Sequence, residues 1–367
     1  MKGLVVWAHS ACRSQMALYR ALGQELDVPM VVPLWQCGEN ELRAAVGFCS
    51  SEFSDMNMVP VGEDYARGLE VIDSHKGWCH LFCVYQRSRN YRRLLLKVAS
   101  RGEHVAVASE APCNMSTGWR RLAKELYFRT KLPSTVKDVV DKAEFFINYS
   151  GNDDKAAQLI GWPKAKIIPF GYFPPPIPQS KCCLRETNHP FEILATGIMA
   201  WHRGCDVLVE ALRILSERGV IYHATITQKG PLLPELKSKA ERYGLPIDFT
   251  GFMPMDDLLK AYESCSVYVG SGRHEPWGMR LNDALNCGAP LVVSRGMGGV
   301  KMIDDYGCGL AYKNEDSLDL ANQLERLAND MSLYNLCAQN AIRAADECSP
   351  LNKARELVCV FRDRMWI

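Results

Sequence analysis

The chain has 367 residues, of which 47% are hydrophobic and 23% charged, a balance typical of a globular enzyme. This length exceeds what one hydrophobic core usually supports, and it therefore predicts two domains. The formal net charge of +1 argues against a general nucleic-acid binder, which carries a large positive excess. We expect no nucleic-acid partner.

The fifteen cysteines predict neither a disulfide framework nor a zinc site. Their number is odd, and the adjacent Cys182 and Cys183 suit neither a bridge nor a pair of zinc ligands. The opening MKGLVVWAHS holds an apolar run too short for a secretory signal, and no stretch approaches the roughly 20 apolar residues of a membrane span. These features predict a reducing, cytoplasmic location.

Strand-like and helix-like segments alternate through the first half of the chain. We expect strands at residues 3–8, 28–34, 80–85, 104–108, 145–148 and 166–169, with helices at 14–26 and 91–100 among them. Such alternation predicts parallel strands with helices on both faces of the sheet.

A proline-rich connector, IIPFGYFPPPIP at residues 167–178, separates this half from a second alternating run. Strands are expected there at 192–196, 223–227, 247–250, 267–269 and 291–294, with helices between them at 205–218, 232–243, 255–265 and 279–286. The sequence thus predicts an α/β fold of two Rossmann-like doubly wound domains, residues 1–172 and 179–351, facing across a ligand-binding cleft. The amphipathic segment 352–367 is expected to pack back on the first domain.

The segment SGRHEPWGMRLNDALNCGAPLVVS, residues 271–294, carries the strongest functional signal. A helix that begins near Gly278 would present the N–H groups of Gly278, Met279 and Arg280 to an anion such as a diphosphate. Glu275 precedes this helix and Asp283 lies inside it. Carboxylates accept hydrogen bonds from vicinal hydroxyls, as sugar and ribose recognition requires.

These residues resemble glycosyltransferase family 4, the retaining enzymes of the two-domain GT-B fold. The family has a Glu, seven residues and a second Glu, then a helix and a Cys-Gly-x-Pro turn. This chain has Glu275, seven residues and Asp283, followed by CGAP at 287–290. Further likeness lies in ATG to HRGCD at 195–206 (phosphate loop), TGF at 250–252 (base-binding segment), IPFG at 168–171 (hinge) and GMGGV at 296–300.

The resemblance implies that Glu275 contacts donor-sugar hydroxyls, Asp283 the ribose, and Arg203 the leaving diphosphate, which Arg203 would stabilise electrostatically. The remaining donor-binding candidates are Gly197, Lys229, Phe252, His274, Gly278, Met279 and Arg280, with Trp277 shaping the loop. No Asp-x-Asp metal motif stands at a strand end, so no divalent metal or other cofactor is expected. The nucleotide-sugar is a co-substrate, and the family is described as retaining.

Two positions depart from the family pattern. Ile198 stands where the family has its first basic residue, and Lys229 or Arg273 are candidates to supply the missing charge. Asp283 is one methylene shorter than the family's second Glu. In the first domain, Glu110 follows the expected strand 104–108 and is a third catalytic candidate, near where other members often place a His. The alternative for Glu110 is an ordinary loop carboxylate.

A basic and aromatic segment, WRRLAKELYFRTK at residues 119–131, has two interpretations. With Arg87, Arg89, Arg92 and Arg93 it could form a face that binds anionic lipid surfaces or polyisoprenyl-phosphate acceptors. Alternatively it is a solvated helix whose apolar residues pack inward.

Taken together, the sequence predicts a retaining, metal-independent hexosyltransferase. It would use a UDP- or GDP-sugar and a hydroxyl of a glycan or polyisoprenyl-linked oligosaccharide in surface polysaccharide synthesis, in the cytoplasm or on the inner face of the membrane. Two alternatives stay open: a GT-B-fold nucleotide-sugar epimerase, and a catalytically silent nucleotide-sugar binding protein.

Overall fold

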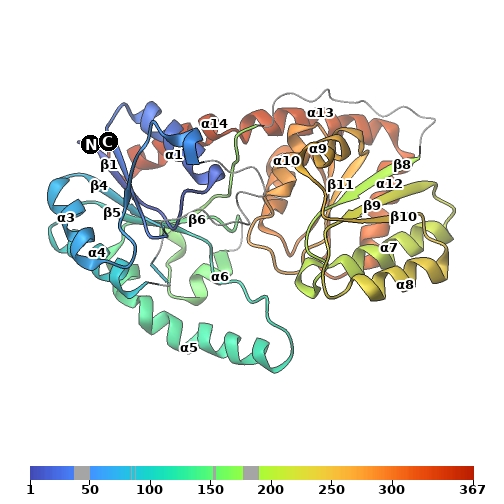
Figure 1. Ribbon diagram of the computed structural model, residues 1–367, viewed down its shortest axis with the longest axis horizontal. Coiled ribbons are helices and arrows are strands. Elements are labelled where there is room, and N and C mark those ends of the chain that lie inside the picture. Colours follow the sequence, from blue (N-terminus) through green and yellow to red (C-terminus); the bar gives the residue numbers. More distant parts are fainter. Residues whose placement is uncertain (37–49, 84, 87, 152–153, 177–189) are drawn as a thin grey trace. The chain divides into compact units, whose positions relative to one another are not determined.

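The computed structural model describes the whole chain except residues 37–49, 84, 87, 152–153 and 177–189 (Figure 1). The chain forms two compact units. The first comprises Met1–Pro175 together with Ser349–Ile367, and the second comprises Pro176–Cys348. Each unit is described by itself below.

The first unit is built on a parallel sheet of seven strands in the order β3-β2-β1-β4-β5-β6-β7. Its central strands are runs of buried apolar residues, as expected where helices cover both faces of a parallel sheet. The strands are β1 (Leu4–Trp7), β2 (Met30–Leu34), β3 (Asn57–Pro60), β4 (Cys79–Phe82), β5 (Val105–Ser109), β6 (Phe146–Asn148) and β7 (Ile167–Pro169).

The described helices of this unit are α1 (Arg13–Leu26), α3 (Tyr65–Ser74), α4 (Arg89–Ser100), α5 (Gly118–Lys142), α6 (Asp154–Leu159) and α14 (Pro350–Asp363), with short 3-10 turns η1 (Ser50–Phe53) and η2 (Lys164–Lys166). The C-terminal helix α14 packs on α1. Beyond it, the Trp366 indole donates a hydrogen bond of 2.8 Å to Glu144 and lies 5.0 Å from the Phe145 ring. The end of the chain is therefore part of the first unit's core.

The second unit repeats the arrangement with six parallel strands in the order β10-β9-β8-β11-β12-β13. In both sheets the strand order reverses once, between β1 and β4 and between β8 and β11, which is the doubly wound Rossmann pattern. The predicted fold class is confirmed. The strands are β8 (Phe191–Ala195), β9 (Tyr222–Thr227), β10 (Ile247–Gly251), β11 (Val267–Gly270), β12 (Leu291–Ser294) and β13 (Gly309–Tyr312).

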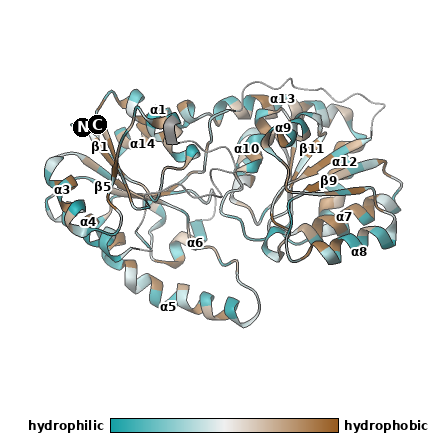
Figure 2. Ribbon diagram, viewed as in Figure 1, coloured by the Kyte–Doolittle hydropathy of each residue, from teal (hydrophilic) through white to brown (hydrophobic). Residues whose placement is uncertain are grey.

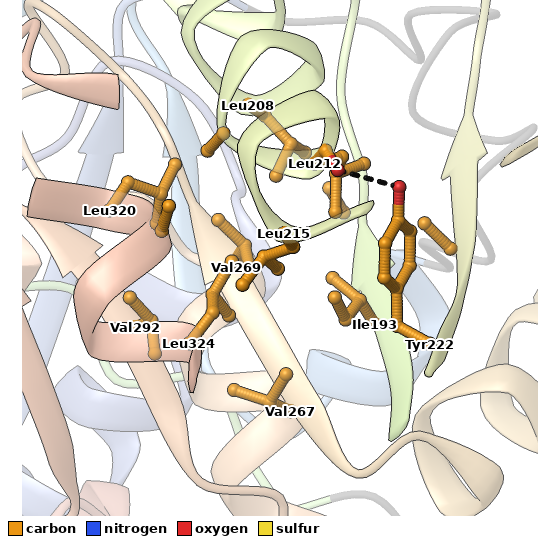
Figure 3. Packing of buried hydrophobic residues seen from close by; sticks show 14 of the residues in the cluster. Ile193, Leu208, Leu212, Leu215, Tyr222, Val267, Val269, Val292, Leu320 and Leu324 are labelled. Atoms are coloured by element: carbon orange, nitrogen blue, oxygen red, sulfur yellow. Dashed lines mark hydrogen bonds between the residues drawn. The ribbon is translucent and has the colours of Figure 1, made fainter. Parts of the chain in front are cut away.

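The core of the second unit lies between this sheet and its helices (Figure 3). Leu208, Leu212 and Leu215 project from one face of α7 toward β8 and β11, because residues at this spacing share one side of a helix. Figure 2 shows apolar residues concentrated on the strands of both sheets. The helices are α7 (Cys205–Glu217), α8 (Leu233–Tyr243), α9 (Met255–Ser264), α10 (Arg280–Asn286), α11 (Lys301–Tyr306), α12 (Ser317–Asn329) and α13 (Met331–Glu347), with turns η3 (Trp201–Arg203) and η4 (Gly298–Val300).

Candidate functional site

The two strands at which the second sheet reverses, β8 and β11, are each followed by a loop that carries predicted site residues. Gly197 and Arg203 follow β8, whereas His274, Glu275 and Gly278 follow β11. Ligands of open α/β sheets bind at the carboxyl ends of the strands at such a reversal. The fold therefore brings these five residues to one corner of the unit.

Arg203 and Glu275 form an ion pair that joins the two loops. Gly204 allows the loops to come this close, because its φ is 65° and an added Cβ would lie 1.9 Å from the carbonyl oxygen of Ser271. The Ser271 hydroxyl donates a hydrogen bond of 2.9 Å to the Arg203 carbonyl. Glu275 is mostly buried and Arg203 partly so, and charges interact more strongly there than in open water.

Arg273 does not supply the charge missing at residue 198. Its guanidinium is buried, donates to both Asp206 carboxylate oxygens at 2.7 and 2.6 Å, and bonds the Trp201 carbonyl at 2.6 Å. Burial alone would raise the pKa of the Asp206 carboxyl, but the hydrogen bonds and charge of Arg273 lower it overall. Arg273 thus holds the loop after β8 against the loop after β11.

The segment before α10 presents the amides predicted to bind an anion. Gly278 has a φ of 94°, and a Cβ there would lie 2.5 Å from the Met297 methyl group. The N–H groups of Gly278, Met279 and Arg280 have no hydrogen-bond acceptor within the described part of the chain. Helix α10 itself begins at Arg280 and has only seven residues. We therefore expect the amides of this turn to contribute more to anion binding than the dipole of the short helix does.

Trp277 lies in the core rather than at the ligand-facing surface. It is 2% exposed, and its indole N–H donates a hydrogen bond of 3.0 Å to the Asn282 side chain. The Trp277 carbonyl accepts from the Gly299 amide at 2.9 Å. Trp277 therefore shapes the loop by packing, with its ring covered by protein.

Asp283 pairs with Arg280 within α10, at 3.0 Å between Nη1 and Oδ2. Two tyrosines on neighbouring elements meet Thr196 from the loop after β8. The Thr196 hydroxyl lies 2.8 Å from the hydroxyl of Tyr268 and 3.5 Å from that of Tyr262. Burial, then the Tyr268 and Asp283 charges, raises the pKa of Tyr262 well above its usual value. The sequence analysis missed these tyrosines, whose only signal was their place on α9 and β11 beside the motif.

Lys229 is the remaining candidate to supply the positive charge that Ile198 lacks. It is exposed, and it has no ion pair or hydrogen bond from its side chain among the residues described. Its Cε lies 3.4 Å from where a Cβ on Gly251 would stand, and its carbonyl accepts from the Met199 amide at 3.2 Å. Ile198 is 55% exposed and apolar, and Phe252, on the loop after β10, is also exposed.

His274 and His202 lie next to the Arg203–Glu275 pair in sequence. The His274 ring is 5.9 Å from the Trp201 ring. Burial, together with the charges of Arg203 and His274, lowers the pKa of His202. A neutral His202 adds no positive charge to the corner at neutral pH, so Arg203 is the cation that the loop after β8 offers.

A family model described as "Glycosyl transferases group 1" matches residues 184–344, which include the whole corner described above. This part of the chain is a group 1 glycosyltransferase domain. The resemblance predicted from the Glu275 motif is confirmed at this level.

Curated relatives match part of the chain. A GDP-mannose-dependent alpha-(1-6)-phosphatidylinositol dimannoside mannosyltransferase of Mycobacterium tuberculosis is 33% identical over 142 residues, 37% of each chain. A mannosylfructose-phosphate synthase of Agrobacterium fabrum is 30% identical over 112 residues, 28% of this chain and 25% of the relative. The chain thus spans between a quarter and little more than a third of the length of these curated relatives.

Solved structures extend the likeness to both units. Anabaena Alr3699/HepE in complex with UDP superposes with a TM-score of 0.66 at 15% identity, covering 99% of this chain and 100% of that one. A glycosyltransferase from Rickettsia africae gives a TM-score of 0.63 at 13% identity, covering 99% and 98%. At such low identity these matches show the fold alone, and that fold is GT-B.

Glu110 belongs to the first unit, apart from the group 1 domain. It follows β5 and accepts a hydrogen bond of 3.1 Å from the Tyr172 hydroxyl. The Tyr172 ring lies 4.9 Å from the Tyr149 ring, and the Tyr149 hydroxyl lies 3.1 Å from that of Tyr19. Burial, and then the charge of Glu110, raises the pKa of Tyr172 well above its usual value. Glu110 thus accepts from a tyrosine whose ring lies beside the Tyr149–Tyr19 hydroxyl pair, an arrangement that the sequence did not predict.

The described residues offer neither a cluster of metal ligands nor a membrane-spanning helix. Their His, Cys, Asp and Glu side chains form no cluster of three that could hold a metal ion. Within the same residues, no helix combines the length and apolarity needed to cross a bilayer. The cysteines that the structure describes are free thiols, whereas Cys182 and Cys183 lie outside the described residues.

Proposed function

We propose that the protein is a retaining glycosyltransferase that moves a hexosyl group from a UDP- or GDP-sugar to a hydroxyl of a glycan or lipid-linked oligosaccharide. The observation that carries the proposal is the Arg203–Glu275 pair at the strand reversal of a group 1 domain. A cation and a carboxylate side by side suit a donor whose sugar hydroxyls donate hydrogen bonds and whose diphosphate carries negative charge.

In the proposed reaction the bond between the sugar C1 and the diphosphate oxygen breaks, and a bond from C1 to the acceptor oxygen forms. Negative charge then grows on the leaving diphosphate. Arg203, Lys229 and the amides of residues 278–280 would stabilise that charge, as preorganised donors do at developing anions. The acceptor hydroxyl proton passes to a phosphate oxygen. Glu275 would hold the sugar hydroxyls and Asp283 the ribose.

No divalent metal has a part in this proposal, because cationic side chains and backbone amides take its electrostatic role. The proposed donor carries either uracil or guanine as its base. The name of one relative specifies GDP-mannose, and the solved structure with the TM-score of 0.66 holds UDP. Glu110 is proposed to contact the acceptor or the donor sugar.

For the acceptor and the location, the proposal is surface polysaccharide or glycolipid synthesis on the cytoplasmic face of a membrane. The support is that the relatives include the phosphatidylinositol dimannoside mannosyltransferase and a putative colanic acid biosynthesis glycosyltransferase of Escherichia coli, WcaL. A lipid-linked acceptor would require the protein to work at a membrane surface.

The test is a thermal-shift screen of the full chain against UDP, GDP and their sugars, because a ligand that binds only the native state raises its melting temperature. Hits are then incubated alone, with and without EDTA. Slow release of free sugar and nucleoside diphosphate, unaffected by EDTA, supports the transferase. An epimerised sugar supports the epimerase, and binding without turnover supports a silent binding protein. Absence of any stabilising nucleotide contradicts the proposal.

A further inference from the structure

The first half of α5, the long helix drawn at the bottom of Figure 1, has no fully buried residue. The buried residues of this helix of 25 residues begin only at Leu132, although the helix begins at Gly118. Pro133, inside the helix, stands beside the point where packing starts. Residues 118–131 therefore form a largely exposed helical segment, which contacts the core of the first unit through the half-buried Phe128, and we refer to them as the α5 arm.

The α5 arm carries the most exposed cluster of large apolar side chains in the first unit. Trp119, Leu122 and Leu126 are 74%, 71% and 62% exposed. Their spacing of three and four residues places them on one face of the helix. Burying such side chains against the rest of the unit was one of the two interpretations of the sequence, and the structure contradicts it for these three residues.

Basic side chains flank that apolar face. Arg120, Lys124 and Lys131 follow one side of the helix, and Arg129 lies on the other side, where it pairs with Glu125 at 3.6 Å. Arg120 also lies 5.7 Å from the Trp119 ring. Residues 118–131 contain one acidic residue, Glu125, and five basic residues. The arm combines an apolar stripe with a strong positive charge.

The neighbouring helix α4 adds less to this face than the sequence suggested. Arg92 donates hydrogen bonds to the carbonyls of Tyr85 and Gln86 at 3.0 and 3.2 Å, and burial lowers its pKa. Arg93 lies 3.9 Å over the Tyr65 ring. Arg89 is exposed at the start of α4, which packs on α5, whereas Arg87 lies outside the described residues.

We propose that the α5 arm is a docking surface for an anionic lipid bilayer. Its apolar stripe would enter the boundary between headgroups and acyl chains, and Arg120, Lys124 and Lys131 would contact lipid phosphates. The positive charge of the arm favours an anionic bilayer as the partner. An exposed tryptophan among leucines, flanked by cations, suits a negatively charged lipid interface better than a neutral protein surface. The inference goes beyond sugar transfer and depends on no nucleotide.

Vesicle flotation of the full chain tests the proposal, with vesicles of phosphatidylcholine alone and of phosphatidylcholine mixed with an equal amount of phosphatidylglycerol. We expect binding to the anionic vesicles only. The triple variant Trp119→Ser, Leu122→Ser, Leu126→Ser should lose that binding. The variant Arg120→Gln, Lys124→Gln, Lys131→Gln should weaken it about a hundredfold, because each cation near an anionic surface contributes about fivefold. High salt should weaken wild-type binding in the same way.

Two controls distinguish vesicle binding through the α5 arm from nonspecific hydrophobic binding. The double variant Leu336→Ser, Ile342→Ser removes exposed apolar side chains from α13 and should bind vesicles like the wild type. All variants should keep the wild-type circular dichroism and melting temperature, because none of the replaced side chains is buried. Equal binding to both vesicle types, or undiminished binding of the triple variant, overturns the proposal. So does a wild-type dimer that the triple variant converts to a monomer without any vesicle binding, which would make the arm a self-association surface. A chain that transfers sugar but floats with no vesicle contradicts only this inference.

Discussion

Arg273 and Asp206 tie together the two loops that carry the proposed catalytic pair. Arg273 stands two residues before Glu275, and Asp206 three residues after Arg203. The two hydrogen bonds between them, of 2.7 and 2.6 Å, fix the relative position of these segments. A bidentate pair of this kind restrains direction as well as distance. The pair therefore positions the Arg203–Glu275 contact without itself facing the donor.

Arg273→Lys should lower kcat by about tenfold to a hundredfold while the protein stays folded. Lysine keeps the charge but cannot bridge both Asp206 oxygens and the Trp201 carbonyl, and small displacements of reacting groups cost up to about a hundredfold. The measurement is kcat and KM for donor hydrolysis. Arg213→Lys is the matched control, because Arg213 pairs with Glu210 on the outer side of α7. A kcat equal to that of the wild type would contradict a positioning role.

Arg203→Met should reduce kcat/KM by about 10²–10³, the usual loss when one preorganised donor to a developing anion is removed. Methionine retains the aliphatic packing but places no charge at the diphosphate. The variant should also bind UDP or GDP more weakly, whereas its affinity for the nucleoside alone should not change. Equal losses for the nucleoside and the diphosphate would indicate a disordered loop rather than a lost phosphate contact.

Asp283→Asn tests the proposed ribose contact. The substitution removes a charged acceptor and the ion pair with Arg280 but keeps the side-chain size. We expect the donor KM to rise about tenfold, as for the loss of one hydrogen bond to a charged group, with a smaller effect on kcat. The wild type should prefer a ribose donor over its deoxyribose analogue, and the variant should not. A variant that still discriminates between these donors places the ribose elsewhere.

His80 gives the first unit a pH-dependent stability. It is buried in β4, accepts a hydrogen bond of 3.0 Å from the Trp7 indole, and burial lowers its pKa from 6.5 to about 3. The folded state therefore holds His80 neutral, whereas the unfolded chain binds a proton below pH 6.5. Its contribution to stability is present above that pH and is lost as the pH falls toward 3.

In that window His80 should add up to about 1.4 kcal/mol per pH unit to the slope of the unfolding free energy, the value for one proton. Urea unfolding at several pH values measures the slope. His80→Gln keeps an acceptor for Trp7 and should give a shallower slope between pH 3 and 6.5 than the wild type. Identical slopes for the two proteins would show that His80 does not titrate in this way.

Much of this architecture could be predicted because the central strands are uninterrupted apolar runs and the helices between them have regular spacing. Two of the four edge strands, β3 and β13, could not be predicted. β3 (NMVP) ends in a proline and is partly exposed, and β13 (GLAY) is short, so neither shows the buried-strand pattern. Strands at an edge bury one side less completely, which weakens the sequence signal.

The motif residues Arg203 and Glu275 could be placed at one corner from the sequence, because consecutive strands of a doubly wound sheet end on the same side. Their supports could not be predicted. Arg273 and Asp206 are far apart in sequence, and only tertiary packing decides that Arg273 turns inward to a carboxylate rather than outward to a phosphate. The same holds for Trp277, which is buried and whose carbonyl accepts from the Gly299 amide of a later turn.

Gly204→Ala should abolish donor binding, because it would push apart the loops that follow β8 and β11. A Cβ at this residue would lie 1.9 Å from the Ser271 carbonyl oxygen, a distance no Cβ can occupy, and its φ of 65° already disfavours alanine. Gly244→Ala is the matched control. Gly244 has a similar φ of 59° at the end of α8, but a Cβ there meets nothing within 4 Å. The Gly244→Ala variant is therefore destabilised only by backbone strain, of about 1 kcal/mol. Both variants should unfold cooperatively in urea, and only Gly204→Ala should lose the thermal shift given by nucleoside diphosphate. If both variants bind nucleotide equally well, the close approach of the loops after β8 and β11 is not what forms the site.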